Sequence, residues 1–235
     1  MRDFVAGEVV YFNKPLDWTS FDLVNKFRNR LSRKLQVKKI KVGHAGTLDP
    51  KATGVLIVCT GGATKQIDTF QGQTKEYIAK LQLGATTPSF DLEEEVDATY
   101  PTEHITREAV ENVLKQFLGR IEQIPPAFSA CKIDGTRAYQ LARKGKDAPL
   151  KAKELIIDEI ELIDYQLPIL KIRVVCSKGT YIRALARDIG QALHSGAHLI
   201  TLERTRIGEV TLAQCLDIDD IDAYLNSPFE GGRGM

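Results

Sequence analysis

The sequence lacks several features that would place the protein in a specialised class. None of its apolar runs approaches the roughly 18 residues that a membrane-spanning helix needs, and its N-terminus has no signal-peptide pattern. It has only four cysteines, none of them in a CxxC pair, which argues against a disulfide framework and offers no zinc-site spacing. No GxGxxG follows a predicted strand, so a dinucleotide-binding fold is disfavoured. We therefore expect a cytosolic globular protein with no metal site and no membrane partner.

Charge is nearly balanced over the whole chain but is unevenly distributed along it. The formal net charge is +1, yet residues 24–41 hold eight Lys or Arg and no acid. Residues 132–153 hold seven basic residues against two acidic ones, and residues 91–97 hold five acids. Two basic runs on a near-neutral chain are typical of a surface that binds a polyanion, although ordinary solvated helix faces give a similar pattern.

Hydrophobic periodicity and turn residues predict a mixture of strands and helices. The predicted strands are residues 8–15, 55–60, 75–84, 154–164 and 170–177. The predicted helices are residues 18–34, 106–119 and 181–196, with Thr19 or Ser20 and Thr106 as N-caps. The acidic residues 91–97 are expected to form an exposed loop. Because strands and helices do not alternate regularly, the predicted fold class is α+β, with a mixed, largely antiparallel sheet flanked by helices and loops.

The most unusual segment is KVGHAGTLDPKATG, residues 41–54, which places Asp49 between Leu48 and Pro50 in a glycine-rich turn. An Asp-Pro pair near glycines is a common structural turn, and a lone His44 is also more often structural than functional. A phosphohydrolase that uses Asp49 as a nucleophile would need a second carboxylate for Mg²⁺. None lies within fifteen residues of Asp49 in the chain, although a distant one could fold in. The neighbouring CTGGATK lacks the spacing of a phosphate-binding loop. The residues alone leave structural and catalytic roles for Asp49 open.

The longer string GHAGTLDPKATGVLIVCTGGATK resembles the catalytic motif of the TruB-type tRNA pseudouridine synthases. Other segments are similar to further motifs of this family and follow in the family's order. They are GEVVYFNKPLDWTSFDLVNKFR, KEYIAKLQLG, IPPAFSACKIDGTRAYQLARKG, CSKGTYIRALARDIG and LERTRIGEV. Together these motifs extend from residue 8 to about residue 210, which is nearly the whole chain.

The resemblance implies the pseudouridine synthase fold, with a catalytic domain at residues 1–212 that includes an RNA-contacting segment at about 124–153. Residues 213–235 would form a short acidic C-terminal extension, in place of the complete C-terminal RNA-binding domain that many members of the family have. The implied reaction is the isomerisation of uridine to pseudouridine in the T loop, at position 55, of tRNA. The implied enzyme is of the bacterial stand-alone type, a monomer that needs no cofactor and no protein partner. The alternative is a non-catalytic tRNA-binding or RNA-folding chaperone.

The resemblance assigns the chemistry to three residues. Asp49 would be the nucleophile that acts on a base flipped out of the RNA loop. Tyr77 in KEYIA would stack against that base and take part in proton abstraction, and stacking contributes about 1–3 kcal/mol per base. Arg183 in GTYIR would pair with Asp49, because a neighbouring guanidinium keeps a carboxylate ionised in an apolar pocket.

The resemblance assigns RNA binding to four further residues. Tyr181 and Leu202 would line the pocket for the base. His44 would contact the RNA loop near the flipped bases, and Lys65 would add a supporting contact. The two basic runs would hold phosphates, and such contacts fix the register of an RNA rather than read its sequence.

Overall fold

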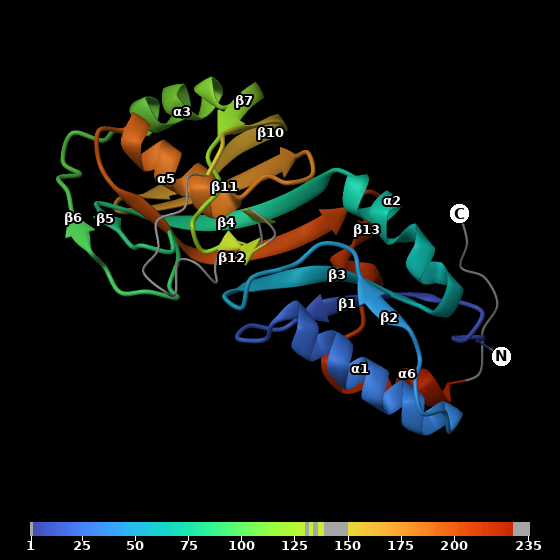
Figure 1. Ribbon diagram of the computed structural model, residues 1–235. Helices are drawn as coiled ribbons and strands as arrows, with labels where there is room; N and C mark the ends of the chain where they lie inside the picture. Colours follow the sequence, from blue (N-terminus) through green and yellow to red (C-terminus); the bar gives the residue numbers. More distant parts are fainter. Residues whose placement is uncertain (1, 130–131, 134–135, 139–149, 228–235) are drawn as a thin grey trace. The chain divides into compact units, whose positions relative to one another are not determined.

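A computed structural model describes residues 2–129, 132–133, 136–138 and 150–227 (Figure 1). The chain folds into two compact units. Unit 1 consists of Met1–Gln73 and Arg204–Met235, and unit 2 of Thr74–Glu203. The basic run predicted at residues 132–153 falls largely outside the described ranges.

Unit 1 is built on antiparallel strands, most of them from the N-terminal part of the chain. Its strands are β1 (Val9–Lys14), β2 (Val42–His44), β3 (Ala52–Thr60) and β13 (Val210–Thr211). β1 pairs with β3 along its whole length, and β2 pairs with the C-terminal end of β3. β13 pairs with the last residues of β12 (Ala197–Ile207), and this part of β12 also belongs to unit 1. Nearly every residue of β3 is buried, which explains its continuous apolar run.

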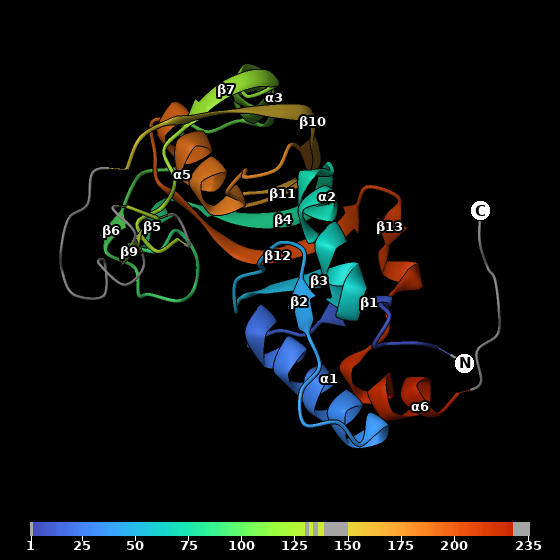
Figure 2. The ribbon, with the colours of Figure 1, turned by 45° about the vertical axis from the view of Figure 1, so that its right-hand side comes forward.

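One long helix covers the core of unit 1. The helices are α1 (Ser20–Leu35), α2 (Ile67–Gly72) and α6 (Ile221–Asn226), with the short 3₁₀ helices η1 (Gly61–Gln66), η2 (Leu212–Gln214) and η3 (Ile218–Asp220). α1 begins as predicted, because Thr19 and Asp22 form a reciprocal capping box. α6 lies beside α1 in both ribbon views (Figures 1 and 2), and its Ile221 and Leu225 are buried in the core that α1 covers. The acidic C-terminal segment therefore contributes apolar side chains to this core.

Unit 2 is an antiparallel sheet with helices packed on it. Its main strands, in spatial order, are β4 (Lys75–Leu83), β11 (Ile169–Cys176), β10 (Lys153–Gln166) and β7 (Gly119–Gln123). The short pairs are β5 (Ala85–Thr86) with β6 (Ala98–Thr99), and β8 (Lys132–Ile133) with β9 (Thr136–Arg137). The helices are α3 (Arg107–Gln116), capped by Thr106 as predicted, and α5 (Ile182–Ala192). α5 contacts α3 and β4, so it is held between a helix and the sheet.

The fold class is α+β, as predicted, and the predicted strands and helices are present with small changes at their ends. The elements that the sequence did not predict include β7, β12, α6 and the helical turn from η1 to α2. The predicted exposed loop at residues 91–97 is wrong for its first residue, because Asp91 is buried while the six residues after it are exposed. No helix in the described ranges is long and apolar enough to cross a membrane.

Candidate active site

Asp49 lies in the loop between β2 and β3, a hairpin in which His44 pairs with Val58. Its side chain is half-buried, and its carbonyl oxygen accepts a hydrogen bond from the Ala52 N–H at 3.1 Å. The neighbouring Leu48 is buried, which anchors the loop to the core on the N-terminal side of Asp49. The Asp49 carboxylate therefore projects from a short loop that β2 and β3 anchor at its two ends.

The segment that leads into α1 holds this loop on both sides of Asp49. The Ser20 hydroxyl accepts a hydrogen bond from the Leu48 N–H at 2.8 Å and lies 3.1 Å from the Leu48 carbonyl oxygen, to which it donates. The Asp17 N–H donates to the Pro50 carbonyl oxygen at 2.9 Å. Ser20 is 2% exposed, so solvent does not compete for these bonds. The backbone before and after Asp49 is thus fixed by one segment.

Arg204, in the C-terminal part of β12, also holds this loop. Its guanidinium donates to the carbonyl oxygens of Val55 at 2.8 Å and Gly46 at 3.1 Å. The side chain is only 2% exposed, so its contacts with these carbonyls are desolvated. Gly54 has a φ of +107°, and a Cβ at this position would overlap the Arg204 backbone. Only glycine lets β3 begin at this separation from β12.

Lys14, the last residue of β1, is fully buried near Asp49. Its ammonium group donates to the carbonyl oxygens of Pro15 at 2.9 Å and Trp18 at 2.5 Å. Burial lowers the pKa of Lys14 to about 8, and the Asp49 carboxylate opposes this by raising it. At neutral pH the amine carries a positive charge close to the candidate nucleophile, which favours the ionised form of Asp49.

Replacing Lys14 with methionine is expected to change how stability depends on pH. In the unfolded chain the amine has its ordinary pKa of 10.5, and in the folded protein its pKa is about 8. Between these values the unfolded state binds more protons, so the free energy of unfolding of the wild type rises with pH. Below about pH 8 both states are protonated, and the full cost of burying the charged amine is present.

Relative to Lys14→Met, the wild type should gain about 2 kcal/mol of unfolding free energy between about pH 7.5 and about pH 9.5. Denaturant unfolding at both pH values measures this difference. Lys26→Met is the matched control, because the Lys26 side chain is partly exposed and should give the same difference at both values. A pH-independent difference for Lys14→Met would mean that the amine keeps an ordinary pKa in the folded protein.

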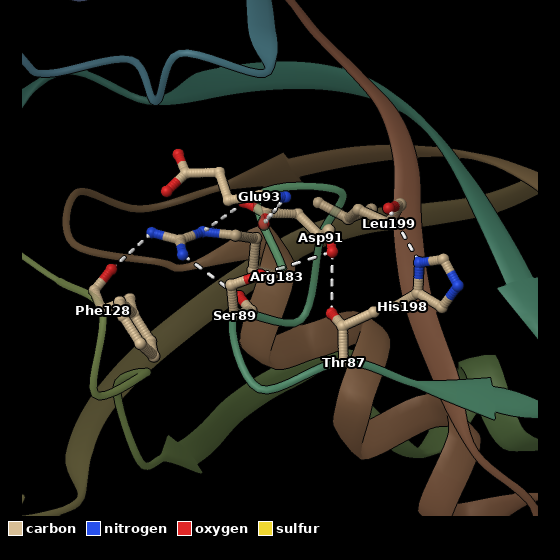
Figure 3. A network of polar contacts seen from close by, with 8 residues as sticks. All are labelled: Thr87, Ser89, Asp91, Glu93, Phe128, Arg183, His198 and Leu199. Carbon is tan, nitrogen blue, oxygen red and sulfur yellow. Dashed lines mark hydrogen bonds and ion pairs between the residues drawn. The ribbon is translucent and has the colours of Figure 1, made fainter. Parts of the chain in front are cut away.

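Arg183 lies in the first turn of α5 and makes a buried ion pair with Asp91 (Figure 3). Its Nε lies 3.5 Å from Asp91 Oδ2, and both side chains are at most 5% exposed. The guanidinium also donates to the carbonyl oxygens of Ser89 at 3.1 Å and Phe128 at 2.9 Å. These three contacts come from two separate loops, so they fix the orientation of the guanidinium.

The loop that carries Asp91 is itself fixed by hydrogen bonds (Figure 3). The Thr87 hydroxyl donates to the Asp91 carbonyl oxygen at 2.7 Å. The Glu93 N–H donates to Asp91 Oδ1 at 3.0 Å, which leaves Oδ2 toward Arg183. Thr87 and Ser89 are also buried. Asp91 is therefore a buried and fixed partner of Arg183, unlike the exposed acids that follow it in the same loop.

Gln123, the last residue of β7, fixes the start of α5. Its amide group exchanges two hydrogen bonds with the backbone of Tyr181, at 2.9 Å to the N–H and 3.2 Å to the carbonyl oxygen. Gln123 is 1% exposed, and Tyr181 is the N-cap residue of α5. This contact holds the backbone from which both Tyr181 and Arg183 project.

The remaining predicted site residues lie on strands and at a helix end. Tyr77 is a buried residue of β4, paired with Val174 of β11, and Leu202 is a half-buried residue of β12. Lys65 lies exposed in η1. His44 ends β2, and burial lowers its pKa, with Arg204 acting in the same direction. The imidazole is therefore mostly neutral at physiological pH.

The structure brings the predicted site residues together in two groups. His44 and Asp49 belong to the hairpin of unit 1, where Lys65 also lies. Tyr181 and Arg183 share the start of α5 in unit 2, which also contains Tyr77 and Leu202. The predicted pairing of Asp49 with Arg183 joins residues of different units and stays a prediction. Ser20, Lys14, Asp91, Gln123 and Arg204 were missed as site residues.

Two family models match the chain. The model described as "TruB family pseudouridylate synthase (N terminal domain)" matches residues 32–182. The model described as "tRNA pseudouridylate synthase B C-terminal domain" matches residues 183–228.

Curated relatives match over nearly the whole chain. A protein of Parabacteroides distasonis called tRNA pseudouridine synthase B is 75% identical over 223 residues, which is 95% of each chain. A protein of the same name from Phocaeicola vulgatus is 71% identical over 224 residues, again 95% of each chain. A third, from Flavobacterium johnsoniae, is 50% identical over 218 residues, 92% of this chain and 95% of the relative.

Solved structures with a similar fold include chains of two protein complexes. A chain of a Cbf5-Nop10-Gar1 complex is 29% identical with a TM-score of 0.68, over 94% of this chain and 55% of that one. A chain of an archaeal box H/ACA sRNP Nop10-Cbf5 complex is 26% identical with a TM-score of 0.66, over 94% of this chain and 54% of that one. The protein thus spans about half the length of these solved chains.

Proposed function

The chain belongs to the TruB family of pseudouridylate synthases and is a tRNA pseudouridine synthase, and from this premise we propose that it modifies the T-loop uridine at position 55 with Asp49 as its nucleophile. The observation that carries the proposal is the way the Asp49 loop is held. Ser20 fixes Leu48 before Asp49, and Asp17 fixes Pro50 after it. Bonds on both sides of Asp49 limit the movement of its carboxylate, and a fixed position is what a nucleophile needs to attack a bound nucleotide.

The proposed reaction requires no external reactant. Asp49 attacks the base or the sugar of a flipped uridine, and the N1–C1′ glycosidic bond breaks. The uracil rotates and forms a new C5–C1′ bond. The bond to Asp49 breaks again, which restores the carboxylate, and the proton lost from C5 is balanced by the proton that N1 gains. No atom is gained or lost overall, so the proposal includes no redox cofactor and no phosphate donor.

The other predicted residues have roles that their surroundings support. We propose that Arg183 keeps Asp49 ionised and that Tyr77 stacks on the base and assists proton abstraction, with Tyr181 and Leu202 beside it. The buried pair with Asp91 supports the role of Arg183, because it fixes the guanidinium before RNA arrives. The lowered pKa of His44 makes its ring mostly neutral, which suits a contact with a base or ribose better than one with a phosphate. Lys65 is exposed and suits a phosphate.

The proposed position of the modified uridine is tested with an unmodified T-arm stem-loop RNA and the purified protein, with no added metal, nucleotide or other protein. Chemical mapping of pseudouridine should find one modified uridine, at the T-loop position. A stem-loop with cytidine at that position is the control and should stay unmodified. Modification of another uridine in the same RNA would overturn the assignment to the T loop. Because tRNA is processed in the cytoplasm, the proposal also places the enzyme there.

Replacing Ser20 with alanine is expected to slow the chemical step more than it weakens RNA binding. The change removes both hydrogen bonds to Leu48 and costs about 2 kcal/mol of stability, because two buried backbone groups lose their partner. A looser Asp49 loop should lower kcat by about tenfold or more, with a smaller change in KM.

Thr19→Ala is the matched control for Ser20→Ala. It removes the N-cap of α1 at a cost of about 1 kcal/mol but leaves the bonds to Leu48 in place. Steady-state kinetics well below the melting temperature should therefore show nearly normal kcat for Thr19→Ala. Equal kcat in the two variants would mean that Ser20 only supports the fold.

A further inference from the structure

The eight basic residues between positions 24 and 41 fall into two sets in the structure. One set, Lys26, Arg30 and Lys34, recurs every four residues and so lies on one face of α1. Lys26 lies 3.7 Å from Asp219 and Arg30 lies 3.5 Å from Asp222. The Lys34 ammonium donates to the Asn226 side chain at 2.6 Å.

The acidic C-terminal segment therefore partners one face of α1. Its side chains come from η3 and α6, which lies beside α1 in both ribbon views (Figures 1 and 2). These are exposed contacts, which contribute little to stability. They nevertheless place carboxylates beside the cations of this face, which lowers the positive electrostatic potential there.

The other five basic residues line one groove of about 780 Å³. They are Arg28, Arg33, Lys38, Lys39 and Lys41, and the remaining lining residues are Asn29, Ser32 and Ile40. No carboxylate lines this groove, and none of its five cations has an ion pair within the described ranges. We call this feature the basic groove.

The basic groove has the chemistry of a site for several phosphates. Five cations that no acid neutralises repel one another, and a polyanion relieves that repulsion. Asn29 and Ser32 add neutral donors suited to phosphate oxygens. Ile40 is the one apolar residue of the lining, so an apolar ligand would find little surface to cover.

The groove is separated from the Asp49 loop along α1. Ser20 contacts that loop at the first residue of the helix, and the groove residues of α1 lie from eight residues later, at Arg28, to thirteen residues later, at Arg33. At 1.5 Å per residue they are about 12 to 20 Å from Ser20 along the helix axis. A flipped nucleotide at Asp49 does not span this distance, so an RNA chain in the groove contributes other nucleotides.

We propose that the basic groove binds the phosphate backbone of the tRNA substrate at nucleotides outside the modified loop. The inference rests on the proposed function for the identity of the RNA. The acidic C-terminal segment then favours binding of the RNA at the basic groove, because it neutralises the other basic face of α1. Contacts of this kind add affinity and orientation without reading sequence.

The test compares two triple variants with the same change in charge and composition. The groove variant is Arg33→Gln, Lys38→Gln and Lys39→Gln, and the control variant is Arg30→Gln, Lys26→Gln and Lys34→Gln. Each replaces one arginine and two lysines on a solvated surface, so circular dichroism should show both folded. The Kd for full-length unmodified tRNA is measured by filter binding at several salt concentrations.

The groove variant should bind tRNA about tenfold or more weakly than the wild type near physiological salt, and its log K against log [salt] slope should be smaller by about 2 to 3. The control variant should stay within about twofold of the wild type. Equal losses in the two variants would reduce the effect to net charge and overturn the proposal, as would an unchanged Kd for the groove variant.

Pseudouridine mapping with the wild type on the same tRNA separates this inference from the proposed function. If only the groove variant loses affinity and the wild type makes no T-loop pseudouridine, the groove proposal is supported and the proposed reaction is contradicted. If the wild type makes T-loop pseudouridine and both variants bind tRNA equally well, the groove proposal is contradicted and the proposed reaction is supported.

Discussion

Replacing Asp49 with asparagine is expected to abolish pseudouridine formation while RNA binding persists. Asparagine matches aspartate in shape but its amide is not a nucleophile, so the single-turnover rate constant should fall by at least about 10³-fold. The bonds from Ser20 and Asp17 reach backbone atoms of Leu48 and Pro50, so the substitution leaves them intact. The Kd for a T-arm stem-loop should stay within about threefold of the wild-type value.

Asp17→Asn is the matched control for Asp49→Asn. Asp17 lies next to the same loop, and its exposed side chain pairs with Lys51 at 2.7 Å. Losing an exposed ion pair costs about 1 kcal/mol or less, and the N–H bond to Pro50 remains. Single-turnover kinetics should therefore show a nearly normal rate constant. A comparable loss in both variants would mean that the carboxylate of Asp49 acts by shaping the loop.

Replacing Asp91 with asparagine is expected to have the second largest effect, on both stability and rate. The substitution leaves the Arg183 guanidinium buried without the charge of this partner. Breaking a buried pair from one side costs about 3 kcal/mol, and denaturant unfolding should show this loss of stability. Arg183 keeps its bonds to Ser89 and Phe128, so it should stay inside but in a less defined orientation.

The rate effect separates a positioning role for Asp91 from a purely structural one. If Arg183 supports an ionised Asp49, then kcat of Asp91→Asn should fall by about 10- to 100-fold while KM changes little. Glu94→Gln changes an exposed acid of the same loop and should leave stability and kcat close to wild type. A stability loss in Asp91→Asn with an unchanged kcat would mean that this ion pair stabilises the fold and has no role in catalysis.

The elements that sequence predicted well are those whose signals are local. α1 begins where Thr19 and Asp22 form their capping box, and α3 begins at its predicted cap, Thr106. β3 contains a continuous run of apolar residues that favour strands, and β4 alternates between buried and less buried residues. β7 and β12 escaped prediction because charged residues interrupt their patterns, such as Arg120 in β7 and Arg204 in β12.

The part of the site that sequence could not supply consists of partners distant in the chain. Asp91 stands in a run of acids that reads as solvated, and only the folded unit brings it to Arg183. Arg204 reaches Val55 across 149 residues, a separation that no periodicity encodes. Ser20 was recognised as a possible cap, but the cap is Thr19, and Ser20 is instead free to bind Leu48. The quoted motifs contain Ser20 and Arg204, so they marked these positions without giving their contacts.

The central claim is that one carboxylate in the β2–β3 loop modifies one uridine of tRNA. The most direct test incubates a full-length unmodified tRNA with the wild type or with Asp49→Asn, without added metal or nucleotide. Mass spectrometry of nuclease fragments then counts pseudouridine at each position. The account predicts one pseudouridine per tRNA, in the T-loop fragment, with the wild type and none with Asp49→Asn. Pseudouridine made by Asp49→Asn, or found only outside the T-loop fragment with the wild type, would contradict it.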